Sequence, residues 1–196
     1  MRAPRLALCT FALLAGTTLA SPAHAQQGAG RPGGTGGQGR GMMMQRMKDD
    51  LVSDLERQRK NMLDYVNVAP DSMLRFQATP GVRTYAQQIH HAASVVSMLV
   101  GGGLGVTPPA EPTDTARLFS SKAALRDDVN ANYDFAVKAV RDAEAQAFMT
   151  EKTIFGMNRT GTRWVHGALE HGTWTLGQTV PYLRMNKVTP PNYLPF

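Results

Sequence analysis

The chain has 196 residues, 42% of them hydrophobic, and its 21 basic and 15 acidic residues give a formal charge of +6. This length is sufficient for one domain with a substantial core. The basic excess is mild, and the sequence shows neither an arginine-rich run nor interleaved aromatic and basic residues, which argues against a nucleic-acid partner.

The N-terminus has the features of a secretory signal peptide of residues 1–25. Two arginines precede a largely apolar run from Leu6 to Ala20, and Ala23-His24-Ala25 fits the small-x-small cleavage pattern. The alternative, a retained membrane anchor, is disfavoured because the run is short for a membrane span. We therefore expect a mature chain that starts at Gln26, is periplasmic or secreted, and has no stable membrane span.

Removal of this segment would also remove Cys9, the only cysteine of the chain. Cys9 does not fit a lipoprotein signal, because most of the apolar run follows it. The mature chain would then have no disulfide, no cysteine nucleophile and no thiolate metal ligand.

Residues 26–41 are half glycine, which predicts a flexible linker ahead of a domain that covers residues 42–196. A phosphate-binding loop is disfavoured because no predicted strand precedes these glycines. The run Met42-Met43-Met44 that follows is interpreted as a frayed helix start, with a soft-metal site as the alternative.

Four segments of the domain carry apolar residues at helical spacing. The predicted helices are Met42–Val66, Val82–Val100, Arg117–Ala143 and about Thr153–Lys187. Their apolar faces contain Met47, Leu51, Leu55, Met62 and Val66, with Gln58 in the gap; Tyr85, Ile89, Ala92, Val96 and Leu99; Leu118, Leu125, Val129, Tyr133, Val137 and Val140; and Leu169, Leu176, Val180 and Leu183. Trp164 and Trp174 are expected to pack in the core and at its boundary.

Glycines and prolines mark the expected helix ends. Gly101-Gly102-Gly103 is expected to stop the second helix, and the Pro- and Gly-rich segment up to Thr115 is expected to form a crossover, either a simple connection or a functional lid. The fourth helix could be interrupted at residues 156–161. Pro181 should kink it or end its straight part. Because no stretch after Met42 alternates convincingly at period two, we predict an all-α fold, an up-down four-helix bundle with a long crossover loop.

Two histidines on different predicted helices could meet in the bundle interior. His91 lies at the margin of the second apolar face and His171 near the fourth, whereas His90 is expected to meet solvent. Neutral imidazoles bind zinc, nickel or iron, but two histidines beside apolar faces are also ordinary packing residues.

A third strong ligand is not evident in this pattern. The positions four residues from His171 are Gly167 and Thr175. His166 and Glu170 lie on other faces of that helix, and the amide oxygens of Gln87 and Gln178 would be weak ligands. These candidates leave a metal site and simple packing both open.

Three stretches resemble the DinB-like (DinB/YfiT) family of four-helix bundles. They are LRFQATPGVRTYAQQIHHAA (residues 74–93), SKAALRDDVNANYDFAVKAV (121–140) and EHGTWTLGQTVPYLRMNKVTPP (170–191). The first is similar to the family's segment leading into a histidine-bearing second helix. The last is similar to its H-x3-H-x-GQ stretch, which ends in a Pro-Pro pair.

The resemblance implies a divalent metal held by one histidine of the second helix and two, spaced i,i+4, of the last. By position these are His91, His171 and Thr175, and a threonine hydroxyl is a poor metal ligand. Such a site could bind a metal weakly with waters, recruit Glu170 or His166 by local distortion, or hold no metal.

Two function classes follow from the resemblance. One is a metal-dependent thiol-S-transferase or hydrolase, in which the metal activates a thiol or water. The other is a non-catalytic or weakly metal-binding module for a small ligand or a partner. Thr175, the linker and the export signal favour the second class. The resemblance and the methionine content also allow a homodimer.

Overall fold

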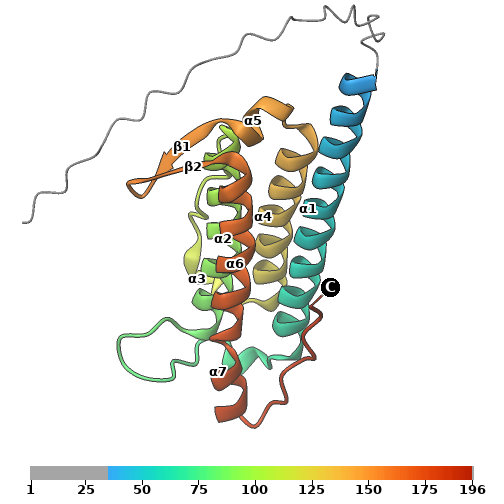
Figure 1. Cartoon of the computed structure of the whole chain (residues 1–196). Helices are drawn as coiled ribbons and strands as arrows, with labels where there is room; N and C mark the ends of the chain where they lie inside the picture. Colours follow the sequence, from blue (N-terminus) through green and yellow to red (C-terminus); the bar gives the residue numbers. More distant parts are fainter. Residues whose placement is uncertain (1–34, 196) are drawn as a thin grey trace, which may run out of the picture. The chain divides into compact units, whose positions relative to one another are not determined.

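The computed structural model describes residues 35–195, which form a helical bundle (Figure 1). The predicted signal peptide lies outside the described residues. The elements are α1 (Thr35–Val68), the 3-10 turn η1 (Asp71–Met73), α2 (Tyr85–Leu104), α3 (Thr115–Leu118), α4 (Lys122–Asp142), α5 (Ala145–Met149), β1 (Glu151–Ile154), β2 (Met157–Thr160), α6 (Gly161–Gly177) and α7 (Val180–Met185). The predicted all-α bundle is confirmed, with one small hairpin added to it.

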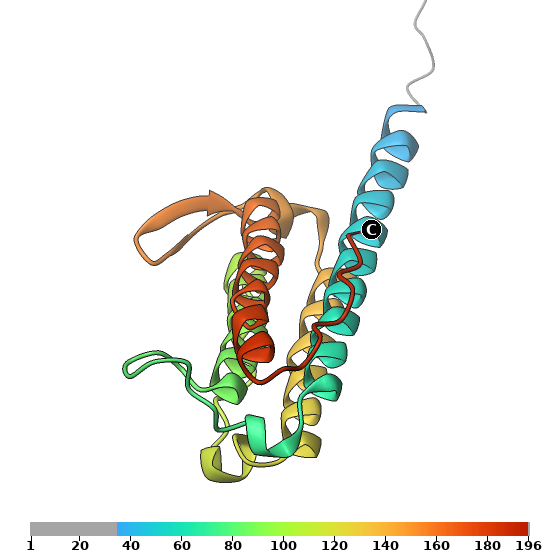
Figure 2. The same ribbon diagram turned by 90° about the horizontal axis from the view of Figure 1, so that it is seen from below.

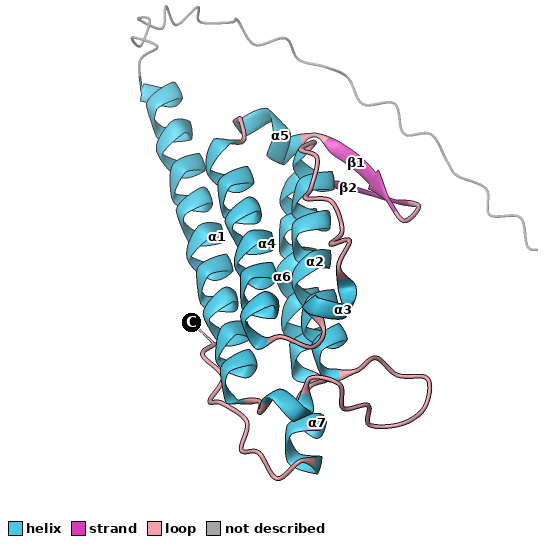
Figure 3. Cartoon of the chain, turned by 180° about the vertical axis from the view of Figure 1, so that it is seen from behind, coloured by secondary structure: helices cyan, strands magenta, loops and turns pink. Residues whose placement is uncertain are grey.

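The bundle consists of α1, α2, α4 and α6, in which α1 and α2 each pack against α4 and α6. α1 and α4 run antiparallel, because Lys48 near the start of α1 donates a hydrogen bond to the carbonyl of Ala143 just after α4. α2 and α4 run parallel, since residues 105–114 cross back along the outside of α2 before α3 begins (Figure 3). This is the long crossover expected from the sequence.

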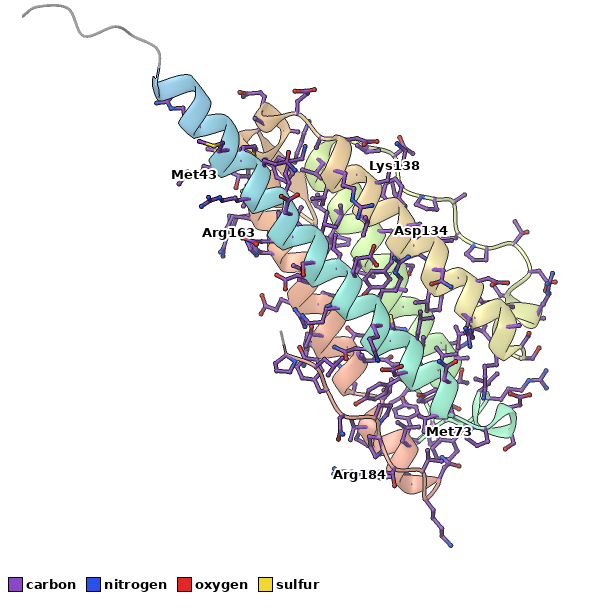
Figure 4. The ribbon with its side chains drawn as sticks, turned by 90° about the vertical axis from the view of Figure 1, so that its right-hand side faces the viewer. Met43, Met73, Asp134, Lys138, Arg163 and Arg184 are labelled. Atoms are coloured by element: carbon purple, nitrogen blue, oxygen red, sulfur yellow. The ribbon has the colours of Figure 1, made fainter. Side chains whose placement is uncertain are left out.

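The side-chain view shows that α1 and α6 also run parallel. Met43 and Arg163, near the starts of these two helices, lie toward one end of the bundle, and Met73 and Arg184 lie toward the other (Figure 4). The C-terminal residues return along α1 (Figure 2), where the carbonyl of Leu194 accepts a hydrogen bond from Asn61. The tail therefore covers part of the α1 surface.

The predicted apolar faces form the core. Fully or almost fully buried members of those faces are Leu51, Leu55, Met62, Val66, Tyr85, Ile89, Ala92, Val96, Leu99, Leu118, Leu125, Val129, Tyr133, Val137, Val140, Leu176 and Leu183. Gln58 is buried with them. Trp164 is buried as expected, but Trp174 is 70% exposed and does not pack at the boundary.

Two predicted helix boundaries were wrong near glycines. α1 begins at Thr35 rather than at Met42, and a Cβ added to Gly37, Gly39 or Gly41 would meet nothing within 4 Å. α2 does not stop at Gly101–Gly103 but continues to Leu104, and Gly105 ends it with φ 75°. The buried glycines serve packing, because a Cβ on Gly103 would lie 2.4 Å from the Cβ of Trp164. Absence of a side chain lets α2 and α6 approach closely.

The expected start of the fourth helix at Thr153 was also wrong. Residues 151–160 form the antiparallel β1–β2 hairpin, and α6 begins only at Gly161 after the N-cap Thr160. The straight part of this last helical segment ends at Gly177, before Pro181, which occupies the first turn of α7, where a proline is tolerated. Among the described helices, none combines the length and apolar character needed to cross a membrane.

Candidate functional site

The start of α2 is fixed by a capping box that sets the position of His91. The Thr84 hydroxyl accepts a hydrogen bond from the N–H of Gln87, and the Gln87 side chain accepts one from the N–H of Thr84. Gln87, considered as a weak metal ligand from the sequence, is therefore used as a cap. His91 follows one turn later on the side of α2 that faces α6.

The opposite wall of the site comes from α6, whose position is set by a buried contact with α1. Gln58 donates hydrogen bonds to the carbonyl of Leu169 (2.6 Å) and to the hydroxyl of Thr173 (2.9 Å). A Cβ on Gly172 would lie 2.6 Å from the Gln58 side-chain oxygen, so glycine permits this contact. The adjacent His171 lies toward α2.

The structure brings His91 and His171 together, as the sequence predicted. Their ring centroids are 5.3 Å apart and the rings are nearly perpendicular, at 80°. Thr175, one turn after His171, places its buried hydroxyl 3.2 Å from His171 Nε2. The three positions implied by the family resemblance are therefore neighbours in space, and the third carries a hydroxyl that already interacts with the second.

Both imidazoles are held in the neutral form. Burial, followed by electrostatic interactions with Arg83, His171 and His90, lowers the pKa of His91 to about 4, although Glu111 opposes the shift. Burial and Arg83 also lower the pKa of His171. At neutral pH each ring can therefore donate one hydrogen bond and accept one.

The remaining candidates do not complete a metal site. Gln178 accepts a hydrogen bond from Gln88 at 2.8 Å. His166 is exposed and lines a different surface pocket with residues of α1, and Glu170 is also exposed. Across residues 35–195, no group of three or more His, Cys, Asp or Glu side chains is arranged to hold a metal ion.

His90 does not meet solvent as expected, because the crossover covers it. Its Nδ1 lies 2.9 Å from Asp128 of α4, and its Nε2 lies 3.0 Å from Glu111 of the crossover. Burial lowers the pKa of His90, but the hydrogen bonds and charges of the two carboxylates outweigh it and the net pKa is raised. His90 therefore joins α2 to both α4 and the crossover, and the two carboxylates favour its protonated form.

Two cavities adjoin this His90 bridge. One of about 360 Å³ lies beside the histidine pair and is lined by Arg83, Gln87, His90, His91, Ser94, Glu111 and Phe119. The other, of about 710 Å³, lies under the crossover and includes Val95, Met98, Pro108 and Leu118 in its wall. Residues of the crossover thus line both cavities.

The comparison with known proteins decides the family. A sequence profile described as DinB superfamily matches residues 54–178. The chain belongs to the DinB superfamily. Among solved structures, the fold is similar to that of a DinB-like protein from Bacillus cereus, with a TM-score of 0.62, 17% identity, and coverage of 74% of this chain and 97% of the other. A search of curated proteins finds no match.

Membership of this superfamily identifies the fold, and the donor set can be tested on the residues present. A catalytic zinc ion normally has three protein ligands drawn from imidazole, thiolate and carboxylate. Here the described residues provide two imidazoles and the neutral hydroxyl of Thr175. This set does not fit a complete metal centre.

The sequence reasoning found the histidine pair but missed three charged residues that define its surroundings. Arg83 precedes α2 and gave no signal of its own. Asp128 and Glu111 are brought to His90 by α4 and by the crossover. The only signal for Glu111 was the unusual length of the crossover, which suggested a lid.

Proposed function

We propose that this DinB superfamily member is an exported binding module for a small ligand, with a partial two-histidine metal site that has no catalytic metal. The observation that carries the proposal is the contact between the Thr175 hydroxyl and His171 Nε2 at 3.2 Å. The Thr175 hydroxyl occupies the position of the third ligand. It also competes with a metal for the Nε2 atom of His171, the second ligand.

The ligand we propose is a small carboxylate or another small anion. Arg83 lines the cavity beside His91, and its charge contributes to the lowered pKa of both histidines. An anion near Arg83 would gain an ion pair and could accept a hydrogen bond from a neutral imidazole. Glu111 at the rim carries the opposite charge, but His90 pairs with it.

Metal content tests the first half of this proposal. The chain from Gln26 would be purified without a histidine tag, beside His171→Ala, after equal exposure to zinc, nickel and manganese. We expect neither protein to retain one metal per chain. One tightly held metal in the wild type, lost in His171→Ala, would overturn the non-catalytic proposal.

Histidine ring resonances test the second half. Addition of acetate or benzoate should shift the NMR signals of His91 and His171 in the wild type and much less in Arg83→Gln. Arg75→Gln, an exposed arginine outside this cavity, is the matched control and should behave as the wild type. Unchanged histidine signals in the wild type would contradict an anion site here.

The alternative function is a metal-dependent thiol-S-transferase or hydrolase of the DinB/YfiT type. Its support is the facing pair of neutral imidazoles, since only a neutral ring can ligate a metal. In that case His91 and His171 would hold the ion, which would supply Lewis-acid activation of a thiol or water. Metal-dependent thiol transfer that disappears in both His91→Ala and His171→Ala would favour this alternative.

Export is part of the proposal and has its own test. The predicted signal peptide implies that the mature chain starts at Gln26 and leaves the cytoplasm. Cell fractionation followed by N-terminal sequencing would show a periplasmic or secreted chain that begins at this residue. A cytoplasmic chain that retains Met1 or Arg2 would contradict export.

A further inference from the structure

The β1–β2 hairpin has a tip whose conformation conflicts with its sequence. The last pair of the ladder is Ile154 and Met157, which leaves Phe155 and Gly156 as a two-residue turn. Both have positive φ, 52° and 76°, as in a type I′ turn. This turn favours Asn-Gly, and a bulky residue in the left-handed region is an outlier.

The fold gives no reason for an aromatic residue at this position. Phe155 is 71% exposed, so its ring is not part of the core. Met157 beside it and Met149 at the end of α5 are also exposed. Three large apolar side chains within nine residues thus face solvent at the end of the bundle where α5 and the hairpin lie (Figure 1). Phe155 and Met157, two residues apart at the turn, therefore offer apolar surface for a contact with another molecule.

One face of the hairpin contacts the bundle, although the turn projects from it (Figure 3). The indole N–H of Trp164 donates a 2.9 Å hydrogen bond to the carbonyl of Lys152. The side chain of Ile154 packs on Gly102, where a Cβ would lie 2.8 Å from its Cδ1. The bundle therefore presents Phe155 on a supported turn.

The hairpin itself has a small excess of basic residues. Residues 151–160 contain Lys152 and Arg159, which are cross-strand partners, and one acidic residue, Glu151. The carboxylate of Glu151 accepts a hydrogen bond from Asn158, which satisfies part of it within the hairpin. Basic residues that flank exposed apolar side chains match an anionic lipid surface, where headgroup phosphates lie above the acyl boundary.

We propose that the hairpin tip, residues 154–157, docks on an anionic lipid bilayer. Phe155 and Met157 enter the headgroup region, and the exposed Arg159 pairs with lipid phosphates. A bilayer fits this tip better than a protein, because a stable protein interface needs roughly 800 Å² per partner and a two-residue turn offers far less. The contact is a surface attachment and is independent of the His91–His171 site.

Vesicle binding by the chain from Gln26 tests this proposal. That chain keeps every described element and lacks the apolar run of residues 6–20, which could bind lipid by itself. It would be co-sedimented with vesicles of phosphatidylcholine alone and with vesicles that also contain phosphatidylglycerol. Phe155→Asn is the decisive variant, because it restores the preferred Asn-Gly turn while it removes the ring. Trp174→Gln is the matched control, since Trp174 is exposed to the same extent, 70%.

We expect the wild type and Trp174→Gln to bind only the anionic vesicles, and Phe155→Asn to bind them about tenfold more weakly or worse, the loss expected for one aromatic side chain. The melting temperature of Phe155→Asn should equal or exceed that of the wild type, which excludes unfolding as the cause. Absence of wild-type binding, or equal binding by Phe155→Asn, would overturn the proposal. So would a change of oligomeric state in Phe155→Asn without lipid binding by the wild type, which would assign the tip to a second copy.

Discussion

The Thr175 hydroxyl lies 3.2 Å from Nε2 of His171, and this contact separates the chain from a three-ligand metal site. His91 and His171 face each other across α2 and α6. The described residues therefore bring together two imidazoles and a hydroxyl, which is a poor metal ligand.

The close approach of α2 and α6 predicts a cost for Gly103→Ala. The new Cβ would lie 2.4 Å from the Cβ of Trp164, so a helix must shift. We expect the free energy of unfolding to fall by about 1–3 kcal/mol, as for overpacked cores. Urea unfolding measures it. Gly167→Ala in α6 is the control, because its Cβ would contact nothing, and it should stabilise by roughly 0.5–1 kcal/mol.

Gln58 should be sensitive to loss of its polar group. Besides its two bonds to α6, its side-chain oxygen accepts a 2.8 Å hydrogen bond from the buried hydroxyl of Tyr133. Gln58→Leu would leave that hydroxyl unsatisfied, at a cost of about 1–3 kcal/mol. Adding Tyr133→Phe should recover part of the loss, as measured by a double-mutant cycle. Additive losses of stability from the two changes would contradict the hydrogen bond between Gln58 and Tyr133.

The helical faces were predictable because burial repeats with the period of the helix. Leu51, Leu55, Met62 and Val66 satisfy that period by themselves, and all four are buried. The convergence of His91 and His171 followed from the same reasoning. The apolar periodicity of the sequence was therefore sufficient to predict which face of each helix is buried in the core.

Features that depend on other elements could not be predicted in this way. A helix stop was predicted at Gly101–Gly103 because glycine is a poor helix former. In the structure, the packing of Gly103 against Trp164 overrides that preference. Each strand of the hairpin has only four residues, too few for a convincing alternation. A helical wheel placed His90 on the outside, but it could not show that the crossover returns over that face.

The two carboxylates that pair with His90 should differ greatly in their contribution to the free energy of unfolding. The Asp128 side chain is 7% exposed and that of Glu111 is 74% exposed. Asp128→Ala removes the buried carboxylate and leaves His90 Nδ1 without an acceptor, which should cost about 1–3 kcal/mol. Glu111→Ala breaks a surface pair and should cost less than about 1 kcal/mol. Chemical denaturation at neutral pH measures both, and equal losses would contradict the assigned burial.

The lowered pKa of His91 predicts a dependence of stability on pH. In the unfolded chain His91 titrates near 6.5, whereas in the folded chain its pKa is about 4. As pH falls from 6.5 toward 4, the unfolded state gains a proton that the folded state does not, so the free energy of unfolding decreases. His91→Gln should flatten this part of the profile. His90 is present in both proteins and its opposite contribution cancels; identical profiles would contradict the buried neutral state of His91.

A zinc titration of Thr175→Cys beside Thr175→Ser and the wild type tests whether the site lacks only a third strong ligand. Cysteine is close in size to threonine, and its thiolate is a strong zinc ligand one turn from His171. Serine keeps the hydroxyl and controls for disturbance of the site. We expect only Thr175→Cys to retain one zinc per chain after dialysis. A wild type that retains one zinc as firmly as Thr175→Cys would show that two histidines suffice to hold the metal, against the proposed function.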